Sequence, residues 1–118
     1  MGESMIFAFN ILVKKVDDYW TAHCLELDIV TTAKTPEEVK VDILDLITAQ
    51  LNYALGHENM KYFFHPAPED VMREFKNCKK YIRSERQVRP KKESDYPVKP
   101  PPYLLISNST DCFNSCHA

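Results

Sequence analysis

The sequence contains only two glycines, Gly2 and Gly56, among its 118 residues. Glycine-rich loops that bind phosphate need several residues without a Cβ atom, because their backbone N–H groups must approach the phosphate closely. Nucleotide-binding loops of this kind are therefore excluded. The sequence also lacks an uninterrupted apolar run of about 18 residues, so no membrane-spanning helix is expected.

The N-terminus lacks the features of a targeting signal. Residues 1–4 carry an acid, and no basic segment leads into an apolar one, so we expect no secretion signal. N-myristoylation needs Ser or Thr at position 6, where this chain has Ile6. A cytoplasmic location and no contact with a membrane are predicted.

Cysteine is scarce and irregularly placed, which favours reduced thiols over a disulfide framework. The four cysteines are Cys24, Cys78, Cys112 and Cys116. Cys112, Cys116 and His117 have the side-chain types of zinc ligands, but a closed structural zinc site needs a fourth ligand, and the other cysteines are remote in sequence. A tail with incidental cysteines is the preferred interpretation, and no metal or cofactor is predicted.

The small net charge of −2 hides an uneven distribution along the chain. Residues 1–70 carry five Lys against twelve Asp and Glu, whereas residues 71–118 carry ten basic and five acidic residues. Two surfaces of opposite charge indicate two kinds of partner, although charge is evidence about binding and not about fold.

The first third of the chain is typical of an antiparallel meander. Apolar side chains alternate along residues 5–16, so that Phe7, Phe9, Ile11 and Val13 share one face of a strand. A polar turn separates this strand from a second one, rich in aromatic and β-favouring residues, over residues 19–25. The β-branched run at residues 29–33 predicts a third strand.

A long helix follows, and its start is the sharpest local signal in the sequence. Thr35 is a good N-cap, Pro36 suits the first helical position, and Glu38 completes a capping box. Apolar residues then recur at helical spacing as far as Gly56, which we expect to end the helix in a left-handed conformation. One face of this helix must cover a sheet.

The second half of the chain is predicted to be less regular. Residues 60–64 read as a fourth strand, and residues 69–83 as a second amphipathic helix. Proline and lysine dominate the segment after Ser84, which predicts an extended tail containing at most a short strand or docking segment at residues 103–107. The predicted division is a core at residues 1–66, a basic amphipathic helix at 67–84 and a tail at 85–118.

The order of these motifs resembles that of the HicB-like antitoxins. The resemblance covers residues 5–64 and rests on an aromatic strand, Tyr19 to Cys24, the turn Cys24-Leu25-Glu26-Leu27-Asp28, the short strand Ile29-Val30-Thr31, and the helix start Thr35-Pro36-Glu37-Glu38-Val39. It implies an α+β fold, a β-β-β-α-β partial RNase H-like core. It also implies a non-enzymatic protein that occludes a small mRNA-cleaving toxin of the HicA type and forms a homodimer or higher oligomer. Members of that family often bind operator DNA, but no clear DNA-binding motif follows Phe64.

The residues themselves argue against a nuclease. RNase H-type cleavage needs clustered carboxylates that hold two divalent ions. One of these carboxylates normally comes from the middle of the first strand. That strand offers Asn10 and no acid. His23 and Cys24 are adjacent on a strand and point to opposite faces, so they do not form a nucleophile–base pair. Trp20 is expected to pack beneath the helix, with interface anchoring as the alternative.

Four acids at the predicted turns are candidates for contact with a basic toxin. They are Asp17, Asp18, Glu26 and Asp28. The alternative for each of them is an ordinary solvated turn residue. Apolar residues that are hard to place in the core are candidates for a subunit or partner interface. They are Met60, Tyr62, Phe63 and Phe64.

Residues 73–92 carry nine basic residues against two acids. Four of them recur at helical spacing and are candidates for contact with nucleic-acid phosphates. They are Arg73, Lys76, Lys80 and Arg83. A solvated helix face and a segment that packs on the acidic sheet of a second subunit are open alternatives. Two other functions also remain open: a HicB-like domain that acts without a toxin, and a nucleic-acid-binding regulator.

Overall fold

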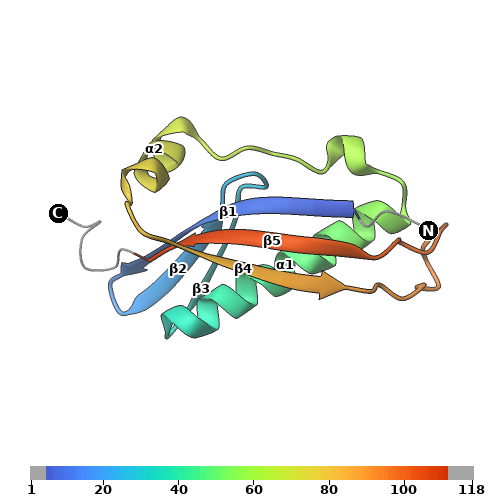
Figure 1. The fold of residues 1–118 in the computed structure, drawn as a ribbon, viewed down its shortest axis with the longest axis horizontal. Helices are drawn as coiled ribbons and strands as arrows, with labels where there is room; N and C mark the ends of the chain where they lie inside the picture. The colour runs from blue at the N-terminus through green and yellow to red at the C-terminus, as the bar shows by residue number, and fades with distance from the viewer. Residues whose placement is uncertain (1–4, 112–118) are drawn as a thin grey trace.

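A computed structural model describes residues 5–111 and shows an α+β fold built on one mixed sheet of five strands. The strands are β1 (Met5–Val16), β2 (Tyr19–Cys24), β3 (Ile29–Ala33), β4 (Tyr81–Val88) and β5 (Tyr103–Thr110). The helices are α1 (Pro36–Gly56), the 3₁₀ turn η1 (Met60–Tyr62) and α2 (Glu69–Asn77). The strand order is β3-β2-β1-β5-β4, with α1 lying along one face of the sheet (Figure 1).

The predicted meander is confirmed. β1 pairs antiparallel with β2 from Val16 opposite Tyr19 to Ile11 opposite Cys24, and β2 pairs antiparallel with β3. The turn between β1 and β2 places Asp17 at a positive φ of 56°. Because side chains alternate along a strand, the apolar face of β1 and the small residues of β2 point to the same side of the sheet.

The helix over this face also begins as predicted. The Glu38 N–H donates to Thr35 Oγ1 at 3.0 Å, and Pro36 is the first helical residue. The Glu38 carboxylate accepts from the Lys34 N–H at 3.4 Å, one residue before the position expected for a capping box. The buried side of α1 packs on the sheet face to form the main core. The strand residues of this core include Phe9, Ile11, Val13, Ala22 and Cys24, and the helix residues are Val39, Ile43, Ile47, Leu51 and Ala54.

The expected role of Gly56 is wrong. Gly56 is the last helical residue and has no positive φ, whereas Glu58 adopts the left-handed conformation with φ 53°. A Cβ atom on Gly56 would lie 2.6 Å from Cγ of Tyr96. The Gly56 carbonyl also accepts from the Val98 N–H at 3.1 Å, so glycine is needed here because the connection between β4 and β5 crosses closely over the end of α1.

The predicted fourth strand at residues 60–64 is also wrong. Met60–Tyr62 form the 3₁₀ turn, and Phe63 is buried against Phe9, with 6.3 Å between the ring centroids. Phe64 is 50% exposed and Tyr62 is 63% exposed. The strand that lies beside β1, opposite β2, is β5, which runs parallel to β1.

The predicted basic helix and tail are corrected at two points. The helix ends at Asn77 instead of residue 83, and Tyr81 to Val88 form β4. The tail contributes β5, which lies between β1 and β4 in the middle of the sheet. The end of β5 is buried although its residues are polar, because hydrogen bonds within the sheet satisfy their hydroxyl groups. Thr110 Oγ1 accepts from the Val13 N–H at 2.8 Å, and the Ser107 and Ser84 hydroxyl oxygens lie 2.6 Å apart.

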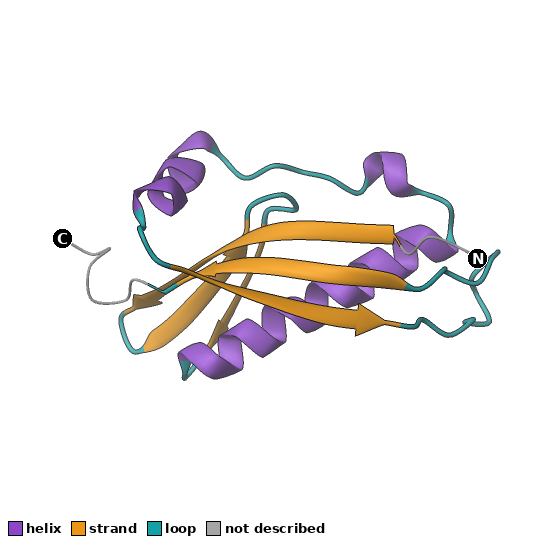
Figure 2. Cartoon of the chain, viewed as in Figure 1, coloured by secondary structure: helices purple, strands orange, loops and turns teal. Residues whose placement is uncertain are grey.

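Among residues 5–111, only part of the second face of the sheet is covered. α2 packs over one end of it through a small cluster of Leu12, Leu25, Ala67 and Cys78, joined by partly buried apolar residues of α2. The other end of this face is open to the viewer in Figure 2, with α1 behind the strands. Ile6 of β1 is 62% exposed there, and its neighbour Leu104 on β5 is partly buried.

Two expectations about the chain as a whole can be examined in the described residues. Cys24 is a free, buried thiol, but Cys78 is disulfide-bonded, so the prediction that all cysteines are reduced is wrong at Cys78. Within residues 5–111, none of the helices combines the length and the apolar character needed to cross a membrane.

If β5 is part of the core, its two neighbouring leucines must differ sharply in their effect on stability. Leu105 is 1% exposed beneath α1, whereas Leu104 lies on the opposite, partly covered face. We expect Leu105→Ala to lower the free energy of unfolding by about 2–5 kcal/mol, and Leu104→Ala by roughly 1 kcal/mol or less. Urea unfolding followed by circular dichroism measures both. Equal effects would contradict the central position of β5.

Candidate protein-binding surface

The four acids predicted to contact a partner do not form one surface. Asp17 and Asp18 lie in the turn between β1 and β2, whereas Glu26 and Asp28 lie in the connection between β2 and β3. These two turns are at opposite ends of β2, which has six residues. At about 3.3 Å per residue, the two pairs of acids are about 17–20 Å apart.

Glu26 has a structural role that its place in a predicted turn did not indicate. Its carboxylate accepts from the Asn10 backbone N–H and from Asn10 Nδ2, both at 2.8 Å. The Leu25 N–H donates to the Asn10 carbonyl at 2.9 Å. Because β2 ends opposite Ile11, Glu26 and Leu25 satisfy the β1 backbone just beyond the ladder, and Glu26 is not a free binding group.

Asp28 is also engaged within the fold. It has a positive φ of 54°, and its Oδ1 lies 2.6 Å from His23 Nε2. The Asp28 side chain is 43% exposed, whereas the His23 side chain is 17% exposed. This contact fastens the turn to the face of β2 opposite α1, which makes the turn role of Asp28 the better supported one.

Asp17 and Asp18 remain exposed, and the fold places other acids near them. Ala33 at the end of β3 pairs with Trp20, so the β1–β2 turn and the start of α1 lie at the same end of the sheet (Figure 1). α1 begins there with Glu37 and Glu38 and continues with Asp42 and Asp45. We call the set Asp17, Asp18, Glu37, Asp42 and Asp45 the acidic surface.

Most members of the acidic surface take part in none of the ion pairs found among the described residues. Of its members, Asp45 alone takes part in one of the ion pairs among the described residues, with 2.9 Å between Asp45 Oδ1 and Arg86 Nη1. Arg86 also donates to Thr48 Oγ1 at 3.4 Å, which ties β4 to α1. Of the remaining members, Asp17, Asp18 and Glu37 are exposed, and Asp42 is partly buried.

Apolar side chains are interspersed with these acids on the outer side of α1. Asp42, Asp45, Leu46 and Thr31 line a shallow pocket of about 340 Å³ between the helix and β3. The exposed fractions of Val41, Leu46 and Tyr53 are 52%, 39% and 53%. Exposed apolar groups near several acids are suited to a protein partner with a basic surface. The sequence did contain this signal, since Asp42, Asp45, Leu46 and Tyr53 recur at spacings of three, four or seven along the predicted helix.

The four predicted nucleic-acid contacts do not form a helical stripe. Arg73 and Lys76 are exposed on α2, and Lys80 lies in the connection that follows. Arg83 lies on β4, where its Nη2 is 3.0 Å from Glu85 Oε2. α2 and the first residue of β4, Tyr81, nevertheless border a second pocket. This pocket of about 370 Å³ is lined by Asn10, Phe75, Tyr81 and Asn108. Phe75 and Tyr81 stand 4.9 Å apart by ring centroids.

The remaining candidates are placed as follows. Trp20 is partly buried against the core beneath α1, as expected, and Met60 and Phe63 also contribute to the core. Of the proposed interface residues, Tyr62 and Phe64 are exposed. Cys112, Cys116 and His117 lie outside the described residues. Residues 5–111 contain no group of three or more His, Cys, Asp or Glu side chains suited to a metal ion.

Cys24 is predicted to be chemically inert in the folded protein. It is fully buried, and burial together with the nearby Glu26 carboxylate raises the pKa of its thiol to about 12. Because the thiolate is the reactive form, we expect no alkylation of Cys24 by iodoacetamide at pH 8 in the native protein and rapid alkylation in urea. Mass spectrometry of the peptide measures both.

The same raised pKa predicts a pH dependence of stability. The folded state favours the protonated thiol, so this contribution is present below the unfolded pKa near 9 and is lost as the pH rises toward about 12. Cys24→Ala removes the titrating group and should flatten the alkaline decline of the melting temperature. In the alkylation experiment described above, labelling of Cys24 in the native protein at pH 8 would contradict the burial of its thiol.

Comparison with protein-family models, with curated protein sequences and with solved structures finds no match to this chain. The resemblance to HicB-like antitoxins therefore stays a prediction.

Proposed function

We propose that this protein is a non-enzymatic, antitoxin-like inhibitor that binds and occludes a small mRNA-cleaving toxin of the HicA type. The observation that carries the proposal is the acidic surface, where Asp42 and Asp45 line a pocket with the exposed Leu46 of α1, and where four of the five acids take part in none of the ion pairs among the described residues. A ribonuclease that binds RNA must present a basic face, and a surface of this kind would attract that face and compete with phosphate for it.

The order of elements supports a partial RNase H-like core. Three antiparallel strands are followed by a helix and, later in the chain, by a strand parallel to β1. In this proposal β5 takes the place of the strand expected at residues 60–64. The middle of β1 carries Asn10, whose side chain bonds Glu26, where a metal-dependent nuclease needs a carboxylate. Inhibition by occlusion needs only a complementary face.

The proposal includes self-association and a cytoplasmic location. The uncovered part of the second sheet face presents apolar residues of β1 and β5, among them Ile6, Ala8, Leu104 and Ile106, which support a homodimer or higher oligomer. The cytoplasmic location follows from the proposed toxin, which acts on mRNA. It does not rest on the cysteines, since Cys78 is disulfide-bonded.

Co-expression with the product of the neighbouring gene tests the inhibitor function. We expect this chain to restore growth and to co-purify with that product. The variant Asp17→Asn, Asp18→Asn, Glu37→Gln, Asp42→Asn should associate about tenfold more slowly at low salt, because it loses electrostatic steering. Stopped-flow mixing of the purified partners measures the rate.

The matched control removes four carboxylates away from the acidic surface. It is Glu69→Gln, Glu93→Gln, Asp95→Asn, Asp111→Asn, at residues that are all exposed. It should leave the association rate within about twofold of the unmodified chain. Failure to rescue growth and to co-purify would refute the inhibitor function and favour a HicB-like domain that acts without a toxin. Equal rates for both variants would refute the acidic surface as the binding site.

Nucleic-acid binding is a second candidate function, favoured by the pocket lined by Phe75 and Tyr81 with basic residues on the flanking elements. Aromatic side chains near lysine and arginine are typical of sites that stack single-stranded bases. Truncation after Phe64 would not test this candidate, because it would remove β5 from the sheet.

Point substitutions on α2 test nucleic-acid binding without disturbing the sheet. If the site binds single strands, Arg73→Gln with Lys76→Gln should weaken binding and lower the slope of log K against log salt by about 1.4. Fluorescence anisotropy with a labelled oligonucleotide measures this slope. Lys15→Gln with Lys61→Gln is the control, and an unchanged slope in the α2 variant would remove this candidate.

A further inference from the structure

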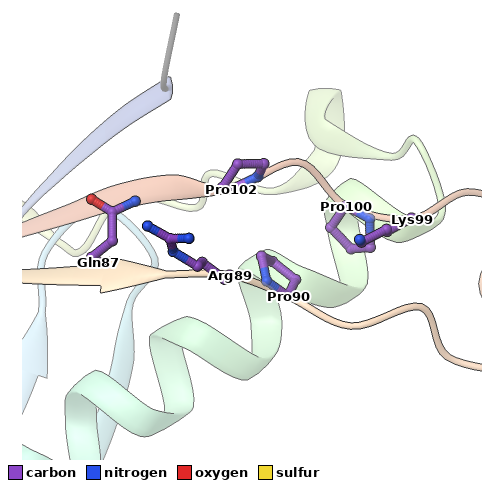
Figure 3. A pocket seen from close by; sticks show the side chains of 6 residues that line it. All are labelled: Gln87, Arg89, Pro90, Lys99, Pro100 and Pro102. Atoms are coloured by element: carbon purple, nitrogen blue, oxygen red, sulfur yellow. The ribbon is translucent and has the colours of Figure 1, made fainter. Parts of the chain in front are cut away.

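The strands β4 and β5 separate at one end of the sheet because prolines interrupt their ladder. Val88 opposite Tyr103 is the last pair of the register. Pro90 follows on one side and Pro100, Pro101 and Pro102 precede on the other, and proline has no N–H to donate. A pocket of about 320 Å³ opens where the two strands separate (Figure 3). It lies beyond the C-terminal end of β4, whereas α2 precedes the N-terminal end of that strand (Figure 1).

Two cations and an amide line this pocket, with the Arg89 guanidinium pointing toward Gln87 and Lys99 lying beside Pro100 (Figure 3). It is lined by Gln87, Arg89 and Lys99 together with Pro90, Pro100 and Pro102 (Figure 3). Pro90 and Pro100 are buried and give the pocket a rigid apolar base, whereas Arg89 and Lys99 are exposed at its mouth. The Gln87 amide donates one N–H to the Tyr103 carbonyl at 3.3 Å, which leaves its second N–H for another acceptor.

The positive charge of this pocket is not neutralised within the described part of the chain. None of the ion pairs or side-chain hydrogen bonds there involves the Arg89 or Lys99 side chain, and no carboxylate lines the pocket. A concave site lined by charge of one sign concentrates counter-ions of the opposite sign. The site is therefore suited to an anion.

We propose that this pocket binds a phosphate monoester, with Arg89 and the second N–H of Gln87 holding the phosphate group and Lys99 adding positive charge beside Pro100. A phosphate monoester carries about 1.5 to 2 negative charges near pH 7, which matches two cations better than a single carboxylate does. The guanidinium fork of Arg89 can donate two N–H groups to phosphate oxygens, and Lys99 adds a point charge. The proline rings would contact the organic part. Pockets for small ligands begin at about 300 Å³, so the ligand is a small one.

Titration of the full chain with phenyl phosphate, followed by NMR chemical shifts, tests this proposal. We expect saturable shifts at Gln87, Arg89 and Lys99, and a dissociation constant raised at least tenfold in Arg89→Gln with Lys99→Gln. Both side chains are exposed, so this variant should retain its circular dichroism spectrum and melting temperature. Lys15→Gln with Lys79→Gln removes the same charge elsewhere and should bind like the unmodified chain.

Comparison ligands define the chemical class. Inorganic phosphate should bind more weakly than phenyl phosphate because it lacks contact with the proline rings, and phenylacetate should bind more weakly because it carries a single charge. Equal binding of phenylacetate, or equal loss of binding in the control variant, would overturn the phosphate site. Absence of saturation in the unmodified chain would also overturn it. Tighter binding of a single-stranded oligonucleotide to the same residues would replace the small ligand by a nucleic acid.

Discussion

The parallel pairing of β1 with β5 is the interaction on which the rest of the structure depends. It joins the first described strand of the chain to the last one, from Met5 opposite Tyr103 to Ile11 opposite Ser109, and it brings β4 into the same sheet. The buried Thr110 bonds both the N–H and the carbonyl of Val13, which closes the far end of this pairing. The main core contains residues from both halves of the chain, since Tyr103 and Leu105 of β5 pack in it with α1 and the first two strands.

This pairing also decides which surfaces are free to bind. α1 covers one face of the sheet and presents its outer side, with the acidic surface, to solvent. α2 covers part of the second face, and its basic residues lie near the pocket of Phe75 and Tyr81. The prolines that end the β4–β5 ladder create the third site, which Arg89 and Lys99 line. The opposite charges of the two halves of the sequence thus belong to separate sites on one sheet.

The acids of the β2–β3 connection illustrate how a charge that looks available can be used by the fold. Glu26 accepts two hydrogen bonds from Asn10 where β1 extends beyond β2, and Asp28 contacts His23. Composition and turn position could not separate these acids from Asp17 and Asp18, since all four look alike in the sequence. The difference arises because β1 is twice as long as β2, which leaves backbone groups on β1 that only a nearby carboxylate and peptide can satisfy.

Local patterns in the sequence determined the first three strands, the start of α1 and the face of β1 that is buried. These depend on side-chain alternation and on capping, which act between residues close in the chain. The sequence offered a short strand at residues 103–107 as one of two alternatives, and the structure confirms it and extends it to Thr110. The tertiary structure alone decided that residues 81–88 are a strand, that residues 60–64 are not one, and where the exposed charges gather. The polar residues Ser107, Ser109 and Thr110 can be buried only because distant strands supply their hydrogen-bond partners. Such partners have no signature in the local sequence, and for that reason the tail was read as extended chain.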